Sequence, residues 1–319
     1  MAGAFEPPLS STVSQSSGKI LVVRGGAIGD FILTLPVLAA LRDRLPKARI
    51  EVLGYRHVAQ LAVAGGLAEE VRAIEARSLA GFFARDGELA GELRDYFSDF
   101  AVVLSYLYDP DGFFQANVAR CSKAQFIIGP HRPDESAGIH ATEVFLKPLE
   151  RLAIFDADPV PRLPFVSRSL SRSRLLAVHP GSGSEQKNWP EGKWAELLHL
   201  LMDTTGGRLL LVGGEAEGDR LERFASRLPR ERIEVARSLP LTELARRLAE
   251  CEGFVGHDSG ISHLAAAVAI PVLVLWNQTT EAVWRPRGEE VRVLRNPEGL
   301  AELQPERVLG ELKSLLRWS

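Results

Sequence analysis

Asp30 closes the stretch RGGAIGD, which follows the apolar run KILVV and precedes residues with helical spacing. A carboxylate at the start of a helix can act as a general base toward a ligand above the strand, or it can simply cap the helix. The neighbouring glycines, Gly25, Gly26 and Gly29, do not follow the G-x-G-x-x-G spacing of a dinucleotide-binding turn. Glu51 begins the next apolar stretch, whereas a dinucleotide site needs an acid at its end. A nicotinamide dehydrogenase is therefore not predicted, and both interpretations of Asp30 stay open.

A second group of candidate residues lies in HPGSGSEQKNWPEGKW, residues 179–194. The small residues of this segment, Ser182 among them, let the backbone approach a diphosphate closely. Lys187 follows them and can reach an anionic oxygen from such a loop. We therefore expect this segment to bind a phosphate group.

The stretch GHDSGISHLAAA, residues 256–267, places three polar or small residues between a strand and a helix. The free N–H groups at the start of that helix make an anion site, and the hydroxyl of Ser259 beside Gly260 adds a donor. Because a carboxylate beside a phosphate would repel it, we expect Asp258 to face sugar hydroxyls instead. His263 either supports this loop or is an ordinary first-turn histidine bonded to backbone.

Two series of apolar strands, each alternating with helical stretches, must position these residues. The expected strands are residues 19–24, 49–55, 70–75 and 99–106 in the first series and 174–181, 207–214, 232–237, 251–260 and 270–277 in the second. Such alternation indicates an α/β fold with parallel sheets. After Asp30, a helix presents Phe31, Ile32, Leu35, Leu38 and Leu41 on one face, and Pro36 is expected to bend it.

The two series indicate two similar α/β domains. We expect an arm over residues 1–18, a first domain over 19–165, a linker over 166–174, a second domain over 175–302 and a terminal helix over 303–319.

Composition restricts the classes of function. The 319 residues are 45% hydrophobic and 25% charged, as in ordinary globular proteins, and the net charge of −3 argues against a nucleic-acid partner. Cys121 and Cys251 form no CxxC pair, so neither a disulfide framework nor a zinc site is predicted, which fits a reducing cytoplasm. Residues 1–18 lack the basic and apolar regions of a signal peptide. The longest apolar run, LAAAVAIPVLVLW, is too short to cross a bilayer.

Taken together, these motifs and their order resemble glycosyltransferase family 9, of the ADP-heptose:lipopolysaccharide heptosyltransferase type. The matching stretches are GAIGDFILTLPVLAALR (26–42), HPGSGSEQKNWPEGKWAEL (179–197), LLLVGGEAE (209–217), LPLTELARRLAECEGFVGHDSGISHLAAA (239–267) and VWRPRG (283–288). The resemblance implies the GT-B architecture, in which two Rossmann-like parallel-sheet domains face each other. The first would serve the acceptor, the second would bind the nucleotide-sugar donor, and the terminal helix could cross back to the first.

The resemblance also assigns catalytic roles to two residues. Asp30 matches the family's Gly-Asp motif and would be the general base that takes the proton of the acceptor hydroxyl. Lys187 matches the phosphate-binding lysine and would stabilise negative charge on the departing diphosphate.

Further donor-binding residues follow from the same resemblance. Asp258 would hold sugar hydroxyls, with His263 supporting its loop, while the remaining phosphate donors would be Ser259, Gly260 and Ser182. Ser259 stands where many members carry threonine, so the hydroxyl is kept. Glu215, or else Glu217, would accept from the ribose hydroxyls, although these glutamates could simply begin a helix.

The implied reaction is an inverting, metal-independent transfer of heptose from ADP-heptose to a lipopolysaccharide-core or other surface-glycan acceptor. No cofactor is implied. The acceptor would be lipid-linked, so the protein would work in the cytoplasm at the inner face of the membrane, with peripheral contact only. Two alternatives stay open. A GT-B nucleotide-sugar epimerase or hydrolase would not need an acceptor-facing base at Asp30, and an inactive nucleotide-sugar binding protein would not be expected to keep both Asp30 and Lys187.

Overall fold

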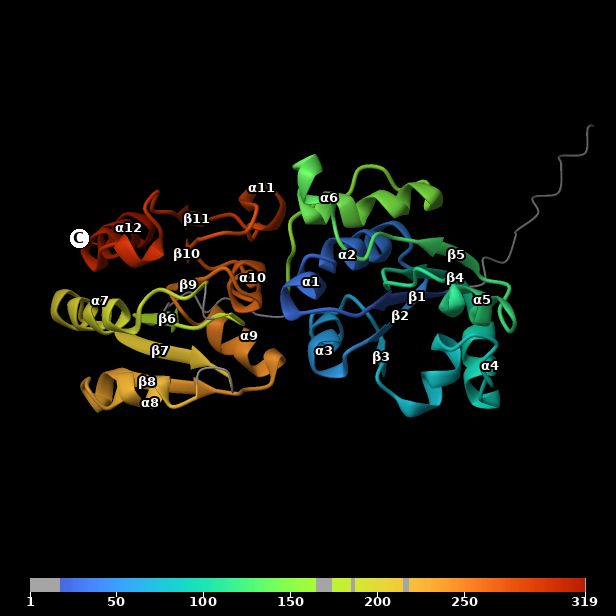
Figure 1. The fold of residues 1–319 in the computed structure, drawn as a ribbon, viewed down its shortest axis with the longest axis horizontal. Helices are drawn as coiled ribbons and strands as arrows, with labels where there is room; N and C mark the ends of the chain where they lie inside the picture. The colour runs from blue at the N-terminus through green and yellow to red at the C-terminus, as the bar shows by residue number, and fades with distance from the viewer. Residues whose placement is uncertain (1–17, 165–173, 185–186, 215–217, 319) are drawn as a thin grey trace, which may run out of the picture.

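A computed structural model of the chain describes residues 18–164, 174–184, 187–214 and 218–318. Its two parallel sheets lie side by side in Figure 1, the first half in blue to green and the second in yellow to red. The first sheet has the order β3-β2-β1-β4-β5, with β1 Lys19–Arg24, β2 Arg49–Gly54, β3 Glu70–Ala73, β4 Phe100–Ser105 and β5 Gln125–Ile128. The second has the order β11-β10-β9-β6-β7-β8, with β6 Leu175–His179, β7 Arg208–Gly213, β8 Ile233–Arg237, β9 Gly253–His257, β10 Val272–Leu275 and β11 Val291–Leu294.

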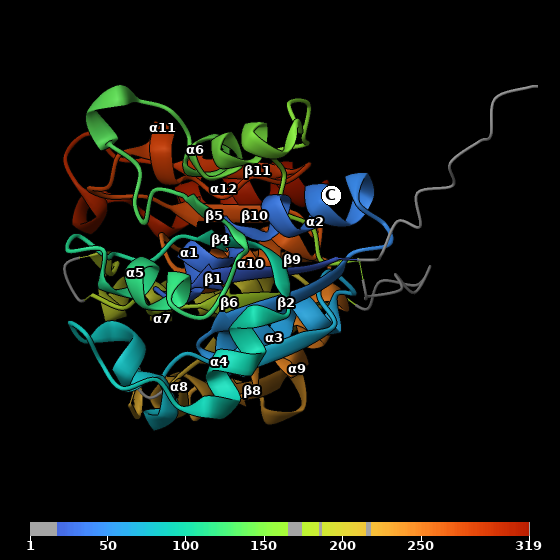
Figure 2. The same ribbon diagram turned by 90° about the vertical axis from the view of Figure 1, so that its right-hand side faces the viewer.

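Helices connect the strands of both sheets. Those of the first half are α1 Ile28–Ile32, α2 Leu35–Arg44, α3 Arg56–Ala64, α4 Gly91–Ser98, α5 Phe113–Ala119 and α6 Ala141–Leu146. Those of the second half are α7 Glu191–Thr204, α8 Arg220–Ala225, α9 Leu241–Ala249, α10 Gly260–Ala267, α11 Glu281–Trp284 and α12 Pro305–Leu316. Figure 2 shows the ribbon from the side of the first half, with the second half behind it.

The central strands of each sheet are almost entirely apolar and buried, because helices cover both faces of each sheet. In β1, Ile20 and Val22 pack with α2 and α3, whereas Leu21 and Val23 point to the opposite face and pack with α4 and α5. In β6 the same alternation divides its residues between the face toward α9 and α10 and the face toward α7 and α12. Each sheet is thus a middle layer between two layers of helices, and the expected α/β class is confirmed.

The hydrophobic core continues from one half into the other. Helix α1 contacts α10 and α3 contacts α9, so one buried apolar cluster includes residues of both halves. A Cβ atom on Gly260 would lie 2.7 Å from Cβ of Ile28 and 3.0 Å from the backbone nitrogen of Gly29. Only glycine therefore fits at this point of contact.

A second, polar contact joins α6 to the segment around α11. His140 donates from Nε2 to the carbonyl oxygen of Arg285 at 2.8 Å, while its Nδ1 accepts from the backbone N–H of Thr142. Arg287 pairs with Glu143 across the same boundary. Burial lowers the pKa of His140 to about 4, so this imidazole joins the halves in its neutral form.

Several sequence expectations need correction. Pro36 does not bend one continuous helix; α1 ends at Ile32, and Pro36 lies in the first turn of α2, where its missing N–H would have had no intrahelical partner. The edge strands β5 and β11 were not expected, because each has only four residues and a mixed pattern.

The terminal helix also differs from expectation. α12 packs against α7 through Val308, Leu309 and Leu312, so it covers the second half and does not cross back to the first (Figure 1). The expected arm over residues 1–18 and linker over 166–174 lie almost wholly outside the described residues.

Candidate functional site

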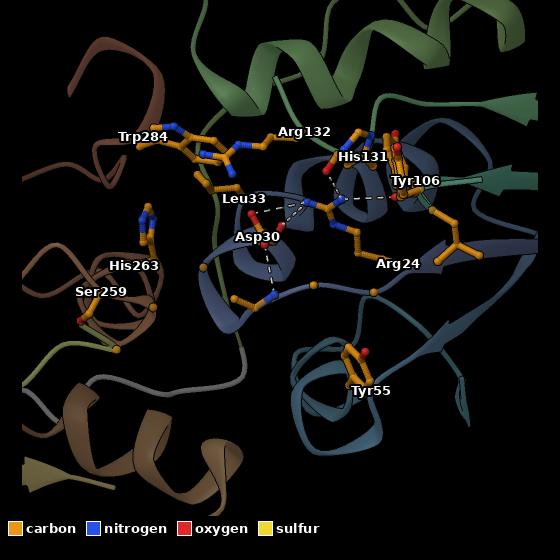
Figure 3. A pocket seen from close by; sticks show the side chains of 18 of the residues that line it. Arg24, Asp30, Leu33, Tyr55, Tyr106, His131, Arg132, Ser259, His263 and Trp284 are labelled. Carbon is orange, nitrogen blue, oxygen red and sulfur yellow. Dashed lines mark hydrogen bonds and ion pairs between the residues drawn. The ribbon is translucent and has the colours of Figure 1, made fainter. Parts of the chain in front are cut away.

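A cavity of about 970 Å³ lies between the two halves, where the loops after β1 and β9 face each other (Figure 3). The first half contributes the segment from Arg24 to Asp30 together with residues that follow β2, β3, β4 and β5. The second half contributes Lys187, Asp258, Ser259, Gly260 and His263. The motifs that lie far apart in sequence therefore meet in one cavity.

Asp30 lies in the first turn of α1 and points into the cavity from the first half. Its Oδ2 accepts from the backbone N–H of Ala27 at 3.0 Å, so it does cap the helix. Gly26 has a φ of +100°, and a Cβ there would stand 2.9 Å from this same carboxylate oxygen. With 31% of its side chain exposed, Asp30 remains accessible to a ligand, so capping and a role as base are compatible.

Arg24 holds the backbone and side chain of Asp30 from behind. Its guanidinium is buried and donates to the carbonyl oxygens of His131 at 2.9 Å, Asp30 at 3.3 Å and Tyr106 at 3.5 Å. Its Nη2 lies 3.9 Å from Oδ1 of Asp30, and the group lies 4.5 Å from the ring centre of Phe145. Burial lowers the pKa of Arg24, an effect that the charge of Asp30 opposes. Arg24 was not among the site residues predicted from the motifs, although a charged residue at the end of an apolar strand is an available signal.

Lys187 and Asp258 face Asp30 from the second half as an ion pair. Lys187 Nζ donates to Asp258 Oδ2 at 2.8 Å, and the hydroxyl of Thr279 donates to the same oxygen at 2.5 Å. The contacts of Asp258 with sugar hydroxyls and of Lys187 with phosphate stay predictions; in the structure the two side chains pair with each other at the cavity wall. A diphosphate in the cavity would compete with Asp258 for the lysine.

The N-terminus of α10 completes this wall. Ser259 is its N-cap residue, and the Ser259 hydroxyl lies 3.4 Å from Nδ1 of His179. Its first N–H groups are the kind that bind anions at helix starts, and the helix dipole adds to them. His263 is buried in the first turns, and burial lowers its pKa to about 4, so it is neutral near pH 7.

The other expected donor-binding residues have different places. Ser182 does not line the cavity: its hydroxyl lies 2.7 Å from the carbonyl oxygen of Ser184 and 2.8 Å from Oδ1 of Asn188, and its single O–H donates to one of these acceptors at a time. Glu215 and Glu217 lie outside the described residues.

Neither a cluster of metal ligands nor a helix able to span a membrane is found in the part of the chain that the structure describes. Within the described ranges, no three His, Cys, Asp or Glu side chains gather in a way that could hold a metal ion. Among the helices of the described residues, none combines the length and apolar character that crossing a bilayer requires.

Comparison with known proteins identifies the family. The model of glycosyltransferase family 9 (heptosyltransferase) matches residues 151–312, which is half of the chain. The chain belongs to glycosyltransferase family 9. Lipopolysaccharide heptosyltransferase 1 of Escherichia coli K12 is 35% identical over 133 residues, which are 41% of each chain. Lipopolysaccharide heptosyltransferase 3 of the same organism is 24% identical over 297 residues, 82% of this chain and 83% of that protein.

Solved structures show the fold of this family 9 chain. The E. coli heptosyltransferase WaaC with ADP matches with a TM-score of 0.74 at 21% identity, over 93% of this chain and 99% of that one. The resemblance to family 9 and the GT-B architecture are thus confirmed. In sequence, the alignments with the first curated relatives span only about two fifths of their length or less.

Proposed function

We propose that this family 9 protein transfers a heptose from ADP-heptose to a hydroxyl of a lipid-linked surface glycan, such as the lipopolysaccharide core, with inversion at the anomeric carbon. The observation that supports it is the convergence of Asp30 from one half and Lys187 with the α10 N-terminus from the other on a single cavity. A base and an anion site on opposite walls are what a one-step displacement needs, because the nucleophile enters opposite the leaving group.

In the proposed reaction, the acceptor hydroxyl lies beside Asp30, whose carboxylate takes its proton as the oxygen attacks the anomeric carbon. The bond from that carbon to the diphosphate breaks, and the electron pair leaves with the nucleoside diphosphate. Lys187 and the backbone N–H groups at Ser259 and Gly260 stabilise this negative charge, so the residues of the chain alone support the leaving group. Asp258, released from Lys187, accepts from hydroxyls of the donor sugar.

The ligands of similar solved structures support ADP-heptose as the proposed donor. The matched WaaC structure contains ADP, and another solved form of that protein contains ADP-2-deoxy-2-fluoro heptose. The acceptor, the peripheral membrane contact and the cytoplasmic location follow from the lipopolysaccharide heptosyltransferases that this chain is similar to.

Calorimetric titration with ADP, GDP, UDP, dTDP and NAD tests the donor class first. Selective binding of ADP supports the proposal, a preference for another nucleoside diphosphate changes the donor, and binding of NAD alone contradicts it. ADP-heptose is then supplied without acceptor. A protein that cleaves ADP-heptose to ADP and free sugar without acceptor as fast as it transfers heptose when acceptor is present is a hydrolase instead.

Two variants separate the roles of the walls. Asp30→Ala is expected to abolish transfer and leave ADP affinity unchanged, because the carboxylate does not touch the donor phosphates. Lys187→Ala is expected to weaken ADP binding by about tenfold or more, since a hydrogen-bonded charge pair with phosphate is lost. Weakened ADP binding in Asp30→Ala would count against the base role, and unchanged binding in Lys187→Ala would remove it from the phosphate site.

A further inference from the structure

Exposed aromatic side chains gather on the wall of the cavity that belongs to the first half. Among the described residues, four aromatic side chains keep 40% or more of their surface exposed: Tyr55, Phe83, Tyr108 and Phe155. The first three line this cavity and come from three different segments, the N-cap of α3, a helical turn after β3 and the loop after β4. Aromatic rings exposed to water in a concave site are suited to ligand contact, because their burial against a ligand is favourable.

Two of these rings are backed by other rings. Phe83 stacks on the buried Phe114 with ring centres 5.2 Å apart, and Tyr108 packs against His131 at 4.6 Å. The protein therefore covers one face of Phe83, and it contacts Tyr108, which stays 72% exposed, through a tilted ring. Such side chains lose little conformational freedom when a ligand covers the other side.

Positive charge on this wall is already engaged. Arg24 is buried among carbonyl oxygens, and Arg132 pairs with Glu135 at 2.7 Å while its guanidinium lies 5.3 Å from the ring centre of Trp284. The remaining charged side chains of the wall, within the described residues, are the carboxylates of Asp30 and Glu75. An anionic acceptor would meet these carboxylates and the donor's diphosphate across the cavity, and the accessible arginine of the wall, Arg132, would first have to give up Glu135.

We propose that the wall formed by Tyr55, Phe83 and Tyr108 selects an uncharged pyranose ring as the acceptor unit, an inference that rests on the proposed function. The C–H groups on one face of a pyranose are apolar and cover an aromatic ring, while its hydroxyls, which are donors, suit the carboxylates of Glu75 and Asp30. An alkyl chain would leave both carboxylates without partners in the buried complex, so the sugar is the better occupant.

Saturation-transfer NMR, with ADP present, measures the binding of methyl glycosides and tests this proposal directly. Methyl α-mannopyranoside and methyl α-glucopyranoside are compared with methyl α-glucuronide, which adds one carboxylate, and with a short alkyl maltoside whose chain and sugar signals are read separately. We expect the neutral pyranosides to bind about tenfold more tightly than the glucuronide. Equal or tighter binding of the glucuronide, saturation confined to the alkyl chain, or no binding of any neutral pyranoside overturns the proposal.

Two variants locate the binding. Tyr108→Leu is expected to weaken neutral pyranoside binding by about fivefold to tenfold and to leave ADP affinity unchanged. Phe155→Leu is the matched control, since Phe155 is similarly exposed but does not line the cavity. If Tyr108→Leu binds the pyranosides as the unaltered protein does, the wall is not the site. Titration of the same samples with ADP tests the proposed donor independently. A failure of the proposed function can therefore be distinguished from a failure of the proposed acceptor wall.

Discussion

Gly260→Ala tests whether the close contact between α1 and α10 sets the geometry of the cavity. The new methyl group would lie 2.7 Å from Cβ of Ile28, and must retreat by about 0.7 Å to reach the 3.4 Å at which ordinary van der Waals contact begins. The obstructing atoms are Cβ and Cγ2 of Ile28 and the backbone nitrogen of Gly29, and none of them is the far end of a flexible side chain. The strain must therefore move α1, which carries Asp30, away from α10.

The expected magnitude follows from overpacking and from misplacement. Inserting a methyl group into a packed contact costs about 1–3 kcal/mol of unfolding free energy. A displacement approaching 1 Å of a catalytic group can slow a reaction by up to about 100-fold, so we expect transfer to slow by about 10-fold to 100-fold. Helix propensity acts in the opposite direction, but Gly260 is the first residue of α10, so the gain of about 0.5–1 kcal/mol that alanine brings to a helix interior is an upper bound there.

Gly310→Ala is the control for propensity. Gly310 lies within α12, and a Cβ there would have no neighbour within 4 Å, so this variant should gain stability and keep full activity. Urea unfolding followed by tryptophan fluorescence gives the stability of each variant, and release of the nucleoside diphosphate gives the rate. A Gly260→Ala protein as stable and as active as Gly310→Ala would refute the idea that this contact positions Asp30.

Three further predictions concern buried polar groups. Arg24→Met leaves three carbonyl oxygens without their donor and should lower the unfolding free energy by about 1–3 kcal/mol in urea titrations, whereas no loss would show that water replaces the guanidinium. Asn117→Leu removes the amide that donates to the carbonyls of residues 81, 82 and 84, and should speed hydrogen exchange in that turn; unchanged exchange would contradict this. Burial lowers the pKa of His257 to about 3 and of His140, His179 and His263 to about 4, from an ordinary 6.5. The unfolded chain therefore binds more protons between these values, and stability should fall as the pH drops from about 6.5 toward 4, by up to about 1.4 kcal/mol per pH unit for each histidine. A urea midpoint that stays constant from pH 7 to pH 5 would contradict the neutral forms.

The sequence predicted the two sheets and most of the cavity because both depend on local patterns. Apolar strands covered on two faces leave a continuous signal, and the motifs around Asp30, Lys187 and Asp258 follow strand ends, where cavities of parallel sheets lie. Contacts that depend on how loops fold back left no such signal. The pairing of Lys187 with Asp258 and the aromatic wall, drawn from several separate segments, are of this second kind.

With the donor bound as proposed, the ion pair between Lys187 and Asp258 makes its entry an exchange of anions. The lysine is neutralised before any ligand arrives, so a phosphate gains only the difference between its own attraction and that of a carboxylate 2.8 Å away. A ligand with a single negative charge is a poor competitor under this condition. A diphosphate can contact the lysine and the helix N-terminus together. The ion pair therefore favours ligands with two or more negative charges over ligands with one.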